Sequence, residues 1–246
     1  MMNDLSREMQ LFLVSTVFGY DMDEEDNNNE KLKLACIGRA YLDLARVIHY
    51  KFSSNDIENS ENENEIEPFL NEKNNFKNDV KNILLNENGT AGELICSVYE
   101  CANSNKYRYT VFKEKYEFTY GMSQKWVNMF NKYMWLFSAG GDDDKKYEMP
   151  IDSYIIDALY KEGILSFDEC KEEKLKTLFI KKSWKGDVEE SKRPSDYIKP
   201  WSKWNKDEYS AVQDLIKNNI PEGESILSWE NELWMKQALE LREINN

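Results

Sequence analysis

The chain has 246 residues, of which 46 are acidic, 32 are basic and one is a histidine, giving a formal net charge of −14. Its 41% hydrophobic and 13% aromatic residues are enough for a folded core, which excludes a wholly disordered chain. No run of about 18 apolar residues predicts a membrane span, and the N-terminus lacks the basic region of a signal peptide. One histidine and four cysteines without a CxxC pair argue against a metal site and a Ser-His-Asp triad. We therefore expect a cytoplasmic protein with reduced cysteines, no metal and no cofactor.

Apolar residues recur at helical spacing along most of the chain, whereas strand patterns and glycine-rich nucleotide motifs are missing. Segment 107–118 is the exception, because its β-formers indicate a short strand or an extended stretch. We expect a mostly α fold with at most a short β-hairpin, in one domain over 1–246. Two lobes around a cleft, 1–113 and 114–246, are the alternative. The predicted helices cover 4–18, 31–51, 79–85, 90–102, 123–137, a stretch from Asp152, 204–216 and 225–242.

Two acidic segments hold most of the negative charge. Residues 21–30 and 55–67 each contain six acidic residues and no basic one. Both are rich in Asn and Glu and poor in apolar anchors, which is typical of solvated loops. We interpret them as acidic loops, or alternatively as a surface that binds a protein partner.

Segment 171–206 has the opposite bias. It carries eleven basic and six acidic residues, interleaved with the aromatic residues Trp184, Tyr197, Trp201 and Trp204. Basic side chains follow phosphates and aromatic faces stack on bases, so this segment could form a nucleic-acid surface. In the other interpretation, the aromatic residues pack a linker onto the core while the lysines face water.

The predicted helix within 121–137 is apolar around most of its circumference. Lys125, Asn128 and Lys132 form a narrow polar stripe along it, with Gln124 at its edge. Lysine stems lie along apolar surface while their ammonium groups reach water. The stripe therefore faces either solvent or a polar cleft.

Segment 149–160 predicts the next helix, and Asp152 stands where its N-cap is expected. A carboxylate there accepts hydrogen bonds from the first free amides of the helix. Capping is the simplest role for this residue.

Together these two segments resemble the helix-hairpin-helix DNA glycosylase superfamily. Gly121 and Lys125 match the G-x-x-x-K pattern that opens a helix in that family, and Asp152 matches the aspartate that begins a later helix. Lys132, seven residues after Lys125, and the Gln124–Lys125 pair are similar to the archaeal 8-oxoguanine glycosylase branch. The resemblance implies a helix-hairpin-helix element.

The resemblance covers residues 118–160 and implies excision of a damaged or modified base from DNA. Lys125 would attack the sugar as an amine, and Asp152 would stabilise the positive charge that develops on the sugar. Further residues would contact the DNA. The amides near Gly121 would bind a phosphate, and Lys132 would lie beside the amine. Gln124 and Asn128 would contact the edge of a flipped base, and Trp126 or Trp201 would stack on its face.

The alternative function belongs to a different class. An acidic helical protein without enzymatic activity, of a phage or mobile-element defence or anti-defence type, would bind a protein partner through 21–30 and 55–67. It would leave the lysine stripe solvated. Neither function requires a membrane.

Overall fold

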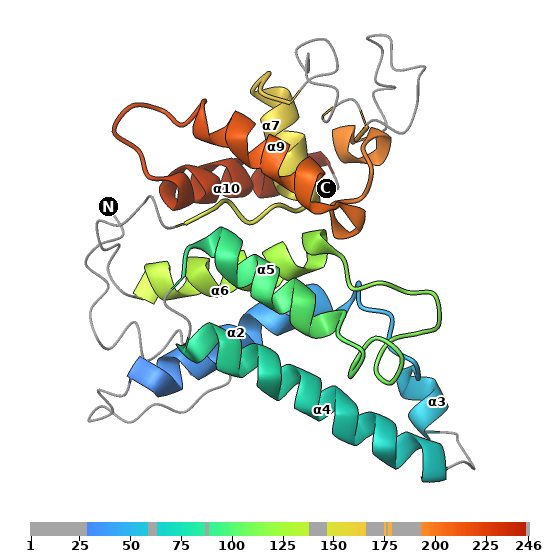
Figure 1. Ribbon diagram of the computed structural model, residues 1–246. Helices are drawn as coiled ribbons and strands as arrows, with labels where there is room; N and C mark the ends of the chain where they lie inside the picture. Colours follow the sequence, from blue (N-terminus) through green and yellow to red (C-terminus); the bar gives the residue numbers. More distant parts are fainter. Residues whose placement is uncertain are drawn as a thin grey trace. The chain divides into compact units, whose positions relative to one another are not determined.

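The computed structural model describes most of the chain, and its described residues confirm the mostly α fold (Figure 1). They form eight α-helices and two short 3-10 helices, without a strand. The chain divides into two units, 1–141 and 142–246, so the division falls later than the lobe boundary considered from the sequence. The described residues are 29–58, 63–86, 89–137, 147–165, 175, 177–178 and 193–244.

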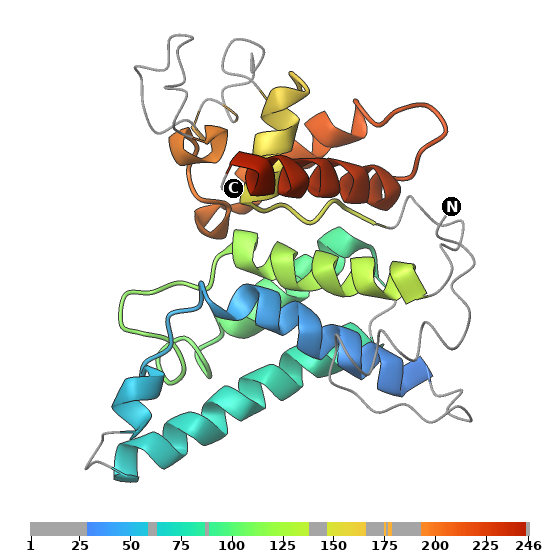
Figure 2. The ribbon, with the colours of Figure 1, turned by 180° about the vertical axis from the view of Figure 1, so that it is seen from behind.

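The first unit is built from four longer helices and one short one. Helix α6 packs against α2 and α5, while α4 packs against both α5 and α2 (Figures 1 and 2). The bounds are α2 Asn29–Ala45, α3 Ser54–Glu58, α4 Glu63–Asn86, α5 Ala91–Ala102 and α6 Tyr120–Phe137.

Phe76 of α4 lies at the centre of an aromatic cluster in this unit. Its ring is 5.3 Å from that of Phe112, 5.8 Å from that of Phe118 and 6.0 Å from that of Trp126, all edge-on. Edge-to-face aromatic pairs add stability beyond the apolar area they bury. All four side chains are at most 2% exposed, so they fix α4, α6 and the 103–119 connection to one another.

The β-forming segment 107–118 makes a single antiparallel bridge, between Phe112 and Tyr50, and no hairpin. Tyr107, Phe112 and Phe118 are buried, because their aromatic side chains fill the core. The aromatic residues that suggested a strand are therefore explained by packing.

The loop predicted over 55–67 is wrong for its described residues. Residues 55–58 belong to α3, and Glu63 begins α4, which therefore starts well before the helix predicted at 79–85 and ends at Asn86. The apolar residues Ile66, Phe69, Phe76, Val80 and Leu84 are buried along one side of α4, while its Asn and Glu residues cover the other sides. Of the acidic segment 21–30, residues 29 and 30 open α2, and the rest lies outside the described residues, as does the helix predicted at 4–18.

The second unit contains three α-helices and two 3-10 helices. Helix α7 packs against α10 and against η2. The buried Asp157 of α7 accepts from Arg193 Nε at 2.5 Å and from Ser195 N at 2.7 Å, which fixes η2 to α7. The bounds are α7 Ser153–Lys161, η2 Pro194–Tyr197, η3 Trp201–Lys203, α9 Lys206–Lys217 and α10 Ile226–Ile244.

Gln213 ties the extended residues before α7 to α9. Its Nε2 donates to Met149 O at 2.7 Å, and its Oε1 accepts from Met149 N at 3.2 Å. One side-chain amide thus satisfies both backbone groups of a buried residue. Among the described helices of the chain, none combines the length and apolar character that crossing a bilayer requires.

Candidate functional site

Helix α6 buries polar side chains along one face, and this face is the candidate site. Gln124 and Asn128 are 0% exposed, Lys125 is 6% exposed, and Asn131 and Lys132 are 8% exposed. At 100° per residue these five positions fall within one third of the helix circumference. The sequence left open whether the stripe faces solvent or a polar cleft, and the structure buries it.

The opposite side of α6 is held by Trp126. Its indole Nε1 donates to Ile37 O of α2 at 3.3 Å, and its ring lies 5.2 Å from that of Tyr41. Trp126 is 1% exposed and its ring packs against those of Tyr41 and Phe76, so the structure does not support the expectation that it stacks on a flipped base. This anchoring fixes the rotation of α6 and therefore the direction of the polar face.

Gly121 lies in the first turn of α6 rather than in a hairpin. Residues 103–119 separate α5 from α6, so these helices do not form the short hairpin that the resemblance implies. At the start of α6, Met122 N donates to Thr119 Oγ1 at 3.2 Å, and Ser123 N donates to Thr119 O at 3.1 Å. The amides that follow Gly121 are thus used by Thr119, and the phosphate-binding role predicted there is not supported.

Two of the three amides of the polar face contact each other. Asn128 Nδ2 donates to Gln124 Oε1 at 3.2 Å, across one turn of α6. Side-chain amides carry both donors and acceptors, which suits them to a polar ligand. The prediction that they contact a base is not tested by this contact.

Asp152 belongs to the second unit and caps α7, as the sequence predicted. Its Oδ1 accepts from Tyr154 N at 2.9 Å and from Ile155 N at 3.0 Å. The side chain is 9% exposed. Lys125 and Asp152 thus each have a defined place within their own unit, and their cooperation in catalysis stays a prediction.

Of the two interpretations of 171–206, the described aromatic residues support packing onto the core. Tyr197 is 8%, Trp201 is 7% and Trp204 is 0% exposed, so these rings are buried rather than available to stack on bases. Trp204 Nε1 also donates to Lys199 O at 2.7 Å, while Lys199 pairs with Glu208. The packing interpretation holds here, and Trp184 lies outside the described residues.

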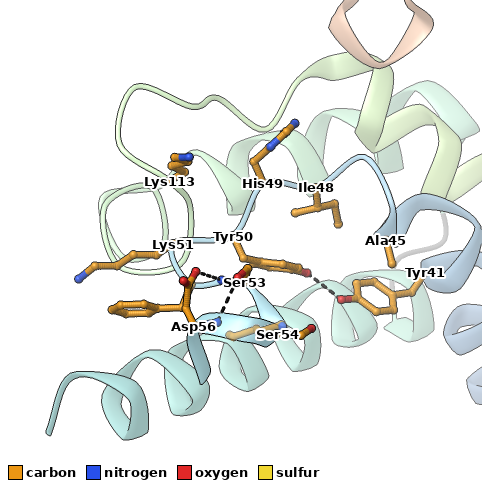
Figure 3. Close-up of a pocket in the computed structure, with 12 residues that line it drawn as sticks. Tyr41, Ala45, Ile48, His49, Tyr50, Lys51, Ser53, Ser54, Asp56 and Lys113 are labelled. Carbon is orange, nitrogen blue, oxygen red and sulfur yellow. Dashed lines mark hydrogen bonds between the residues drawn. The ribbon is translucent and has the colours of Figure 1, made fainter. Parts of the chain in front are cut away.

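A cavity of about 470 Å³ in the first unit was not predicted. Figure 3 shows it at the segment that joins α2 to α3, with Tyr41 and Tyr50 meeting through their hydroxyl groups. Those two oxygens are 2.8 Å apart. The lining residues are Tyr41, Ala45, Ile48, His49, Tyr50, Lys51, Phe52, Ser53, Ser54, Asp56, Lys73 and Lys113.

The cavity was missed because the sequence predicted one helix over 31–51. Helix α2 ends at Ala45, and the chain then extends to pair with residues 111–113: Lys51 N donates to Val111 O at 2.9 Å and Lys113 N donates to His49 O at 3.0 Å. A partner 60 residues away in the chain decides this ending, and local periodicity carries no sign of it. Only the cluster of β-formers at 107–118 hinted at such a partner.

Within the described part of the chain, no group of three or more His, Cys, Asp or Glu side chains could hold a metal ion. Comparisons with protein-family models, curated proteins and solved structures found no match for this chain. Its function is therefore inferred from its own residues.

Proposed function

We propose that this protein excises bases from DNA, or cleaves abasic DNA, through the amine of Lys125. The observation that carries the proposal is the buried polar face of α6, where Lys125 and Lys132 are 6% and 8% exposed. Lysine is among the residues least often fully buried, and burying its charge costs free energy. A helix that buries two lysines and three amides on one face is therefore better explained by chemistry than by packing alone.

Burial is also what an amine nucleophile needs. Enzymatic lysines that form Schiff bases act as the free amine and lie in desolvated sites or beside a second cation. Lys132 lies two turns from Lys125 on the same face of α6. Gln124 and Asn128 offer donors and acceptors to the edge of a flipped base.

The chemistry balances without a cofactor. With an intact nucleotide, the Lys125 Nζ lone pair forms a bond to C1′ while the glycosidic C–N bond breaks, and the base leaves with that electron pair and takes a proton. The sugar ring then opens to an iminium ion as O4′ becomes a hydroxyl. Loss of a C2′ proton breaks the C3′–O bond and releases a phosphate-terminated strand, after which water hydrolyses the iminium and returns the amine.

Borohydride trapping tests the proposal directly, since hydride reduces the iminium to a stable secondary amine. The substrates are duplex and single-stranded oligonucleotides that carry an abasic site, 8-oxoguanine or uracil. We expect the wild-type protein to form a covalent adduct. Lys125→Met should form none because it has no amine, and Lys125→Arg should form none because guanidinium stays protonated.

Lys132→Met is the matched comparison, because it removes an equally buried amine from the same helix. We expect an adduct of lower yield, with the same mass added to the protein. An adduct that survives in Lys125→Met, or no adduct with any substrate from folded wild-type protein, contradicts the proposal.

A second candidate is an acidic interaction protein, which the exposed carboxylates of α3 and α4 favour. Glu58, Glu65 and Glu67 are all exposed, in a chain whose net charge is −14. Replacing these three by Gln keeps the size of each side chain and removes the charge. Loss of capture of a basic protein partner by the triple variant, with trapping at Lys125 absent, would favour this candidate.

A further inference from the structure

Three lysines and one aspartate line the cavity beside Tyr50. Lys51, Lys73 and Lys113 line it, and Asp56 is the acidic residue among its lining. In the part of the chain that the structure describes, none of these lysines forms an ion pair with a carboxylate. The cavity thus carries an excess of two positive charges in a chain of net charge −14.

Asp56 is already engaged by the backbone at the start of α3. Its Oδ2 accepts from Ser53 N at 2.7 Å, and Asp56 N donates to Ser53 Oγ at 3.2 Å (Figure 3). The hydrogen bonds from Ser53 hold the pKa of this carboxyl below its usual value, with a further contribution from Lys113. The carboxylate therefore caps the start of α3, and its charge offsets one of the three lysine charges at the cavity.

Lys73 is the most enclosed of the three lysines. Its Nζ lies 4.1 Å from the centre of the Tyr50 ring and 5.7 Å from that of Phe69. Burial lowers the pKa of Lys73, and the nearby Lys77 lowers it further. A ring face compensates a desolvated ammonium only in part, so an anion in the cavity would stabilise its charge.

Backbone pairing fixes the main chain of the other two lysines, whose side chains are exposed. Lys51 N and Lys113 N both donate in the ladder between 49–51 and 111–113, at 2.9 and 3.0 Å. At the same cavity, one hydroxyl of the Tyr41–Tyr50 pair donates its proton to the other. The accepting hydroxyl keeps its own proton and can donate it to a ligand. A site formed before the ligand arrives loses less free energy on binding.

We propose that this cavity binds a phosphomonoester, with its phosphate among the three lysines and its organic group against Ala45, Ile48 and Phe52. A phosphomonoester carries about −1.5 to −2 charges at pH 7, which matches the local excess, whereas a carboxylate or phosphodiester carries one. Phosphate alone would leave much of a cavity of about 470 Å³ unfilled. The phosphate could belong to a free nucleotide or to the phosphorylated end of a strand, and the site is independent of Lys125 chemistry.

The test is titration calorimetry with four probes: a nucleoside 5′-monophosphate, the parent nucleoside, and one oligonucleotide with either a 5′-phosphate or a 5′-hydroxyl. We expect each phosphorylated probe that binds to do so at least about tenfold more tightly than its unphosphorylated partner, as a charged hydrogen-bond network gives. Binding of the mononucleotide identifies a free small molecule as the source, and binding of the oligonucleotide alone identifies a strand end.

Lys73→Met and Lys77→Met form the matched pair of variants. Both lysines lie on α4 with their ammonium groups over a tyrosine ring, at 4.1 and 4.3 Å, but only Lys73 lines the cavity. We expect affinity to fall at least about tenfold in Lys73→Met and by less than about threefold in Lys77→Met. Equal losses in the two variants, or no preference for the phosphorylated probes, overturn the proposal. Borohydride trapping at Lys125 should be unchanged in Lys73→Met. A missing phosphate site can therefore be distinguished from a missing amine nucleophile.

Discussion

Two variants, Asp152→Ala and Asp152→Asn, distinguish the structural role of Asp152 as an N-cap from a chemical role. Its Oδ1 accepts two backbone hydrogen bonds, from Tyr154 N at 2.9 Å and Ile155 N at 3.0 Å. Alanine removes both acceptors, whereas asparagine keeps an oxygen in the same place. Helix α7 has only nine residues, so its first turn is a large part of it.

The expected loss of unfolding free energy depends on which backbone amides each variant leaves without a hydrogen-bond acceptor. Replacing an N-cap by alanine costs about 1–2 kcal/mol of unfolding free energy, and the upper part of that range applies because Ile155 N is buried. Asparagine loses only the interaction of the charge with the helix dipole, about 0.3–1 kcal/mol. We therefore expect Asp152→Ala to be less stable than Asp152→Asn by about 1 kcal/mol.

Urea unfolding followed by far-ultraviolet circular dichroism measures the difference, and Asp152→Ser serves as a control that restores a capping oxygen. Equal losses for Ala and Asn, or no loss for Ala, would refute capping as the source of stability. Base excision adds the chemical readout: if Asp152 also acts on DNA, Asp152→Asn should remain folded but lose activity.

Two further predictions concern buried or hydrogen-bonded titratable groups. The Tyr107 hydroxyl donates to Asp79 at 2.5 Å and, with Lys106, holds the pKa of that carboxyl below its usual 3.8. A lowered pKa in the folded state stabilises the protein above about pH 4 and loses its effect as the pH falls through the folded-state pKa. Tyr107→Phe should therefore lower the unfolding free energy at pH 6, with a smaller difference near pH 3, and a pH-independent difference would contradict this. Burial raises the pKa of the Cys36 thiol to about 12, and its side chain is 0% exposed. We expect iodoacetamide at pH 8 to modify Cys36 only after unfolding, as mass spectrometry of the peptides would report; rapid labelling of the folded protein would show that α2 opens.

The sequence by itself determined where most helices lie. Apolar spacing predicted α6, α9 and α10, and the helix predicted over 90–102 matches α5, which Thr90 caps. Asp152 was likewise recognised as an N-cap. These features depend on residues within one or two helical turns, so a local pattern is sufficient to find them.

Composition misled where a helix was polar on most of its surface. The Asn- and Glu-rich segment 55–67 suggested a loop, although Ile66, and Phe69 and Phe76 beyond it, mark the buried side of α4. A long amphipathic helix needs only a narrow apolar stripe when neighbouring helices cover it. Spacing was the better guide there than composition.

Only the tertiary structure decided which polar and aromatic residues are buried. Lys125 and Lys132 could have been solvated, and Trp126 could have been free to stack, until packing against Ile37 and Tyr41 fixed the rotation of α6. The cavity likewise exists because residues 49–51 pair with 111–113, which ends α2 at Ala45 and brings Lys73 beside Tyr50. Such contacts join residues far apart in the chain, and their free energy outweighs the local preference that predicted a longer helix.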